Sequence, residues 1–148
     1  MKHVPKDQSL FYSRPEKGNH LNTILYEIGM LEFCFETLTT NAGKWRDNRD
    51  SYICLESFLL HYRNLVEFFG GEAGLRSSAP DEWSPRHLTA EEVASISDRK
   101  PCDKYRGPIS AYLQHCTPKR ANFDRGWNIG EMYEEIQPLI GSFRRLFC

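Results

Sequence analysis

The sequence predicts an all-α fold, an antiparallel bundle of four main helices and one short helix. Three observations predict it: apolar residues recur at three- and four-residue steps, capping signals precede two segments, and no run alternates like a half-buried strand. The chain has 148 residues, of which 40% are hydrophobic and 26% charged. This size and composition suit one packed core, so we expect a single domain over residues 20–148.

The first half of the chain predicts an arm and two long helices. Residues 1–19 mix Pro, Lys and Gly with isolated aromatics and have no sustained period, which indicates an arm outside the bundle. The first helix is expected from Leu21 to Leu38, and the second from about Asp50 to Phe69, where Gly70 and Gly71 end it. The expected apolar stripes are Leu21, Ile24, Leu25, Ile28, Leu31, Phe35 and Leu38 in the first, and Tyr52, Leu55, Phe58, Leu59, Tyr62, Leu65, Val66 and Phe69 in the second.

A long connection and a short helix come next. Residues 71–88 contain Gly, Ser, two prolines and Trp83, which is typical of a loop. Thr89 followed by Glu92 forms a capping-box pattern, so a short helix is expected to begin there and to end near Ile96.

Two further helices are expected in the last third of the chain. The segment KPCDKYRGP predicts an interruption, with Pro108 as the first residue of a helix that continues to Cys116. Asn128 with Glu131 resembles a second capping box, and an apolar stripe then continues to Leu146. These helices complete the predicted bundle.

Charge and hydropathy exclude several functional classes. The formal net charge is −1, from 19 basic and 20 acidic residues, so no global basic field would drive non-specific nucleic-acid binding. The N-terminus lacks the apolar run of a signal peptide, and no segment has the ~20 apolar residues of a membrane span. These patterns predict a cytoplasmic protein without a membrane partner.

The sequence also lacks the familiar cofactor and metal motifs. Its five cysteines are scattered and never paired as CxxC, which suits reduced thiols better than disulfides or zinc ligands. No GxGxxG, GxxxxGK[ST], GxSxG or HExxH motif is present. We therefore expect no cofactor and no metal site.

The second predicted helix carries two polar stripes. Helical spacing places Ser57, His61 and Asn64 on one stripe. The other holds Arg63 at i,i+4 spacing to Glu67, together with Glu56. The first stripe is compatible with a cleft, with a solvated helix face, or with buried hydrogen bonds that hold the bundle in register.

The end of the fourth predicted helix and the segment after it carry the second group of candidate residues. His115 comes shortly before Pro118, Lys119 and Arg120, so it either complements a helix C-terminus or joins His61 and Asn64 in a titratable cluster. The two cations and Trp127 could hold a nucleotide or phosphate backbone, or else form a solvated loop anchored by its aromatics.

The order of these segments resembles a group of uncharacterised bacterial helical proteins. They share an H-x-R-N-L core on one helix, a later helix that ends in His, and a last helix led by Trp. The matching positions here are His61, Arg63, Asn64, Leu65, His115 and Trp127. That group is distantly similar to the HEPN superfamily, whose members are small helical bundles, often dimeric, and in many cases metal-independent ribonucleases of toxin and phage-defence systems.

The resemblance has one departure at the catalytic motif. The superfamily's ribonucleases carry Arg, four to six residues, then His, but Ser110, Ile109 and Pro108 occupy the positions five to seven residues before His115. The leading hypothesis is therefore a HEPN-like, non-catalytic interaction module that forms homo-oligomers and acts in stress or phage defence, with RNA or a partner protein as its ligand.

Two alternatives stay open. In a divergent ribonuclease, His115 would act as the general acid or base and Arg63 or Arg120 would stabilise the phosphate, while His61 and Asn64 position the substrate. In a ligand-binding bundle, Tyr62, His61 and Trp127 would line a small-molecule site between helices.

Overall fold

The computed structural model describes residues 21–71, 83–114 and 126–147. Within them the chain is all-helical, with four long helices and one short helix. The helices are α2 (Leu21–Thr40), α3 (Asn48–Phe69), α4 (Ala90–Ser95), α5 (Lys100–Gln114) and α7 (Ile129–Phe147). The predicted fold class is thus confirmed, while the predicted arm over residues 1–19 lies outside the described residues.

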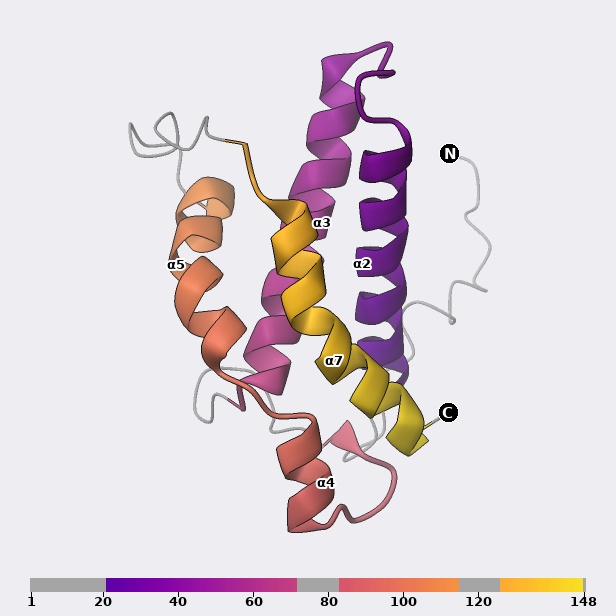
Figure 1. The fold of residues 1–148 in the computed structure, drawn as a ribbon, viewed down its shortest axis with the longest axis vertical. Helices are drawn as coiled ribbons and strands as arrows, with labels where there is room; N and C mark the ends of the chain where they lie inside the picture. The colour runs from indigo at the N-terminus through magenta and orange to yellow at the C-terminus, as the bar shows by residue number, and fades with distance from the viewer. Residues whose placement is uncertain (1–20, 72–82, 115–125, 148) are drawn as a thin grey trace, which may run out of the picture.

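Helices α2 and α3 form an antiparallel hairpin (Figure 1). Gly43 in the turn between them has a φ of 72°, a left-handed conformation that favours glycine. Asp47 then caps α3, because its side chain accepts a hydrogen bond from the backbone N–H of Arg49 at 2.9 Å. The expected helix bounds were correct to within two residues at each end.

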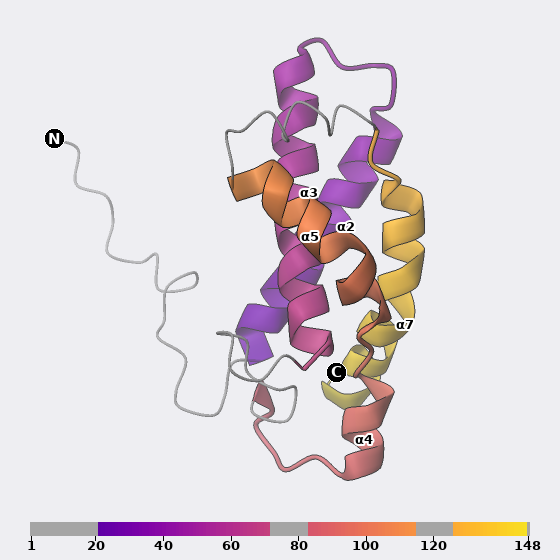
Figure 2. The ribbon, with the colours of Figure 1, turned by 90° about the vertical axis from the view of Figure 1, so that its left-hand side faces the viewer.

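Helices α5 and α7 cover one side of this hairpin. Figure 1 shows α7 crossing in front of α2 and α3, and Figure 2 shows α5 alongside α3. The Phe35 ring of α2 stacks on Tyr133 of α7 with centroids 3.9 Å apart. The Tyr105 hydroxyl of α5 donates to Glu131 of α7 at 2.8 Å. The core therefore lies between the hairpin and this second pair of helices.

The core is rich in aromatic and branched aliphatic side chains. Its largest fully buried members are Tyr62, Phe58, Phe69, Phe143, Ile28, Leu31, Leu59, Leu65, Ile96, Ile109, Met132 and Ile136. One predicted member of the second stripe was wrong: Tyr52 is 54% exposed. It lies in the first two turns of α3, where the expected apolar face extends beyond the part that other helices cover.

The short helix α4 is where the sequence predicts it. Thr89 accepts a hydrogen bond from the backbone N–H of Glu92, and the Glu92 carboxylate accepts one from the backbone N–H of Thr89, so the capping box is complete. Buried Leu88 and Ile96 flank the helix at its two ends. Helix α4 itself packs against α7.

The interruption predicted at KPCDKYRGP was wrong. Helix α5 begins at Lys100, where the Asp98 side chain accepts from the Lys100 backbone N–H at 2.9 Å, and Pro108 lies inside it. Proline within a helix removes one backbone hydrogen bond. Tertiary contacts on either side of Pro108 favour the continuous helix, since Tyr105 packs edge-on against Tyr62 and Ile109 is fully buried.

Candidate functional site

The first polar stripe of α3 lies along the contact between α2 and α3. His61 Nδ1 is 2.6 Å from Glu27 Oε2, and the Asn64 side-chain amide donates to the same oxygen at 3.2 Å. The His61 residue is only 6% exposed. Two predicted site residues therefore come together, but they do so on a carboxylate of the neighbouring helix.

The third member of that stripe also contacts α2. Burial raises the pKa of the Cys34 thiol of α2, and the interaction of this thiol with the Ser57 side chain acts in the opposite direction. The stripe thus faces α2 at two levels, with hydrogen bonds from His61 and Asn64 to Glu27 at one of them. Such bonds fix the register of α2 against α3, which is one of the three interpretations that the sequence left open.

The second polar stripe of α3 is joined to α5. Arg63 Nε lies 3.3 Å from Glu67 Oε1, which confirms the predicted i,i+4 pair, and Arg106 Nε of α5 lies 3.4 Å from the same oxygen. The Glu67 carboxylate is 16% exposed. Because two guanidinium groups flank one carboxylate, the negative charge of Glu67 is compensated by side chains of the protein itself.

Two further predicted site residues, Trp127 and Tyr62, have their ring contacts with other aromatic side chains. Trp127 is half-buried and meets Tyr112 of α5 edge-on, with ring centroids 5.6 Å apart. Tyr62 is fully buried beside Phe58. His115, Lys119 and Arg120 lie outside the described residues, so their predicted roles in catalysis and phosphate binding stay predictions.

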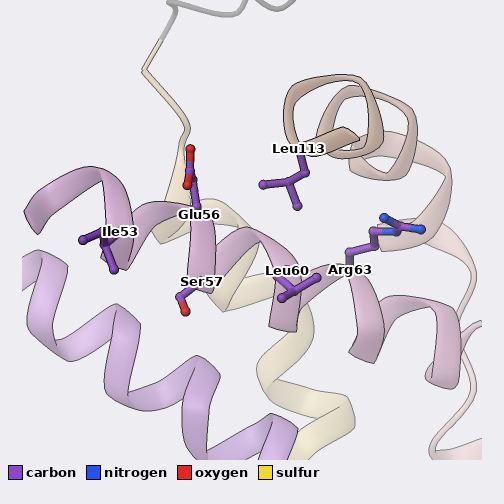
Figure 3. A pocket seen from close by; sticks show the side chains of 6 residues that line it. All are labelled: Ile53, Glu56, Ser57, Leu60, Arg63 and Leu113. Carbon is purple, nitrogen blue, oxygen red and sulfur yellow. The ribbon is translucent and has the colours of Figure 1, made fainter. Parts of the chain in front are cut away.

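A groove follows the exposed side of α3 toward α5 (Figure 3). It has a volume of about 450 Å³. Its lining side chains are Ile53, Glu56, Ser57, Leu60 and Arg63 of α3 and Leu113 of α5. Leu113 extends from α5 toward the row of α3 side chains in Figure 3. The groove is apolar along its centre and carries one acid and one base.

A second, smaller cavity lies near the start of α2. Its volume is about 210 Å³, and it is lined by Thr23, Ile24, Glu27, Asn64, Glu67, Phe68 and Trp83. Both of its carboxylates have partners within the protein, as described above. Neither this cavity nor the groove is lined by Tyr62, His61 or Trp127, the three residues predicted to form a small-ligand site.

The α2–α3 contact divides apolar side chains into two sets. Four residues lie at the contact: Glu27, Cys34, Cys54 and His61. Each is preceded and followed by an apolar residue, which gives the four tripeptides 26–28, 33–35, 53–55 and 60–62. The residues that follow these four belong to the core or pack on it: Ile28, Phe35, Leu55 and Tyr62.

The four preceding residues form what we call the outer face: Tyr26, Phe33, Ile53 and Leu60. They are 44%, 61%, 63% and 43% exposed. Successive helical residues point about 100° apart, and in an antiparallel pair the residues that precede the contact all turn to the same side. The outer face therefore lies on the side of the hairpin away from the core.

The outer face was not predicted from the sequence. Its signal is present, because Tyr26 with Phe33 and Ile53 with Leu60 are each seven residues apart, about two helical turns. These four residues are large apolar side chains that fall outside the predicted core stripes. Exposed apolar residues that align in this way mark interaction surfaces more often than scattered ones do.

Metal-binding clusters and membrane-spanning helices are absent from the described part of the chain. Residues 21–71, 83–114 and 126–147 contain no group of three or more His, Cys, Asp or Glu side chains placed to hold a metal ion. None of the helices in these ranges is long and apolar enough to cross a membrane.

No protein-family model matches the chain, and neither the curated proteins nor the solved structures include a significant match.

Proposed function

We propose that this chain is a non-catalytic interaction module that self-associates through the outer face. The observation that carries the proposal is the alignment of Tyr26, Phe33, Ile53 and Leu60 on one side of two adjacent helices, each more than 40% exposed. Covering apolar surface of this kind removes it from water and stabilises an assembly. The resemblance to HEPN bundles, which are often dimeric, supports the same proposal.

The partners of the polar residues also support a non-catalytic role. In the ribonuclease alternative, His61 and Asn64 would position the substrate. His61 is nearly buried, and both residues contact Glu27 of α2. These contacts join α2 to α3, which is a structural task.

Sedimentation velocity over a wide concentration range tests self-association. The monomer has a mass of 17.3 kDa, and we expect the wild-type mass to rise above it with concentration. Phe33→Ser and Ile53→Ser should shift the equilibrium toward the monomer. Tyr52→Ser is the matched control, since Tyr52 is as exposed as these residues but points about 100° away from Ile53. A wild-type mass of 17.3 kDa at every concentration would contradict the proposal.

An RNA cleavage assay tests the non-catalytic part. Wild type and His115→Ala are incubated with labelled single-stranded RNA and tRNA in the presence of chelator, with thermal melting alongside. We expect no cleavage by either protein. Cleavage by wild type that disappears in His115→Ala, at an equal melting temperature, would instead establish the ribonuclease hypothesis.

A further inference from the structure

The groove on α3 has a self-complementary order of side chains. Leu60 lies at its centre, with Glu56 four residues before it and Arg63 three residues after it, and all three line the groove (Figure 3). At about 1.5 Å per residue, Glu56 lies about 6 Å from Leu60 along the axis and Arg63 about 4.5 Å in the opposite direction. An acid and a base thus stand at nearly equal distances on either side of an exposed leucine.

This order has a consequence for an antiparallel copy of the same helix. If a two-fold axis passes beside Leu60, Glu56 of one copy comes level with Arg63 of the other to within about 1.5 Å. Glu56 and Arg63 also lie to the same side of Leu60 around the helix, because they are separated by seven residues. A two-fold axis perpendicular to both helices leaves Glu56 of one copy and Arg63 of the other on the same side of the helix pair, where they can meet.

We propose that the occupant of this groove is a second copy of the chain, with α3 packed antiparallel on α3 about a two-fold axis at Leu60. This inference rests on the proposed self-association and adds its geometry. Leu60 contacts the same leucine of the second copy, and two Glu56–Arg63 ion pairs form across the axis. A two-fold interface requires such reciprocity, in which residue i meets j and j meets i.

The contact of Arg63 with Glu67 does not by itself prevent this arrangement. A guanidinium group has five N–H donors, and the contact with Glu67 in the same helix uses the Nε of Arg63 at 3.3 Å. One guanidinium group can therefore bond more than one carboxylate. Leu113 of α5 borders the groove and gives the incoming helix an apolar wall.

Charges placed at the axis give the sharpest test. Leu60→Lys and Leu60→Asp each bring two like charges together in a homodimer, so each should raise the dissociation constant by more than about tenfold. An equimolar mixture of the two variants pairs Lys with Asp across the axis and should restore the dimer. Leu60 is 43% exposed, so both variants should keep the monomer fold, which thermal melting at low concentration verifies.

The ion pairs have a test of the same design. Glu56→Lys alone and Arg63→Glu alone should each weaken the dimer, because each then places like charges opposite one another. Their mixture should recover it, since the introduced lysine of one variant meets the introduced glutamate of the other, while the native Arg63 and Glu56 still meet. The matched controls are Tyr52→Lys and Tyr52→Asp, which should dimerise as wild type does. Sedimentation velocity measures all of these proteins and mixtures.

The outcomes separate this inference from the proposed function. Recovery of the dimer only in the mixtures would support the two-fold axis at Leu60. A wild-type dimer that none of these substitutions weakens would overturn the axis and leave self-association intact. The axis would equally be overturned by single variants that dissociate and mixtures that stay monomeric. A monomeric wild type would overturn both proposals.

Discussion

The two sides of the α2–α3 contact carry similar residues, but those on one side are exposed and those on the other pack in the core. In the tripeptide 33–35, Phe33 is 61% exposed, whereas Phe35 stacks on Tyr133 of α7. In the tripeptide 60–62, Leu60 is 43% exposed and Tyr62 is fully buried. The residue types do not explain the difference. What differs is that α5 and α7 lie on one side of the hairpin.

The apolar pattern of these two helices therefore has two origins. On the core side the pattern is satisfied by other helices of the same chain, as the buried ring of Phe143 against Phe68 and Phe69 shows. On the outer face, Leu113 of α5 borders the groove beside Ile53 and Leu60, but all four outer-face residues stay more than 40% exposed. We infer that the core side maintains the fold and the outer face maintains an assembly.

The largest expected effect comes from truncating the two phenylalanines of one tripeptide. Phe35→Ala should lower the free energy of unfolding by about 2–3 kcal/mol, because it removes a partly buried ring that packs on the core. Phe33→Ala should change it by less than about 0.5 kcal/mol, as expected at an exposed position. Urea unfolding at low protein concentration measures both values. Equal losses in the two variants would show that the outer face is covered within the monomer.

The same tripeptides explain how much of the fold could be predicted from the sequence. Apolar spacing located α2, α3 and α7, and the capping box located α4, because both signals depend on residues within one or two turns. The start of α5 was mispredicted because its continuity depends on contacts of Tyr105 and Ile109 with distant residues. Local patterns cannot include such contacts.

The candidate site was predictable only in part. His61 and Asn64 were placed on one stripe by spacing alone, but Glu27 was not associated with them. That association depends on the register of α2 against α3, and the residue pattern of one helix does not determine this register. The outer face was missed for a related reason: apolar residues flank the contact on both sides, and only the positions of α5 and α7 show which flank is covered.

Loss of the polar contact of Glu27 with His61 and Asn64, which lies between the core side and the outer face, should have the next largest effect on the free energy of unfolding. Glu27→Ala removes the oxygen that both His61 and Asn64 bond, leaving two largely buried polar groups without their acceptor. Losses of this kind cost about 1–3 kcal/mol. The exposed Glu134 of α7 provides the control, since Glu134→Ala should stay within about 0.5 kcal/mol. A loss no greater than that of the control would mean that apolar packing alone sets the register.

Removing the N-cap of α4, on the core side of the molecule, should lower the free energy of unfolding by a smaller amount. Leu88 and Ile96 are buried at the ends of this helix, so its order helps to close the core. Thr89→Ala removes the side-chain acceptor of the capping box and should cost about 1 kcal/mol. Chemical denaturation detects a loss of this size. Ser95→Ala at the other end of α4 is a control that leaves the box intact.

Acid should weaken the same cap in a defined range. Hydrogen bonds from Arg86, and then from the Thr89 backbone, lower the pKa of Glu92 from 4.5 to about 2. A carboxyl group with a lowered pKa in the folded state contributes stability above its unfolded pKa, and this contribution is lost as the pH falls through the folded value. The melting-temperature difference between wild type and Glu92→Gln should thus be constant above about pH 5. It should shrink between pH 4.5 and 2.

The smallest expected effect distinguishes a face covered by its own chain from one covered by a second copy. Contacts within a monomer stabilise it equally at every concentration, whereas association adds stability that grows with concentration. Near the dissociation constant this addition is only about 0.4 kcal/mol, from RT ln 2. Raising the protein concentration through that range should therefore raise the wild-type melting temperature slightly and leave that of Ile53→Ser unchanged. Phe35→Ala provides the converse case: its core is damaged but its outer face is intact, so it should melt at a lower temperature and still respond to concentration. If Ile53→Ser responded as strongly as wild type, the surface that associates would have to lie elsewhere than on the outer face.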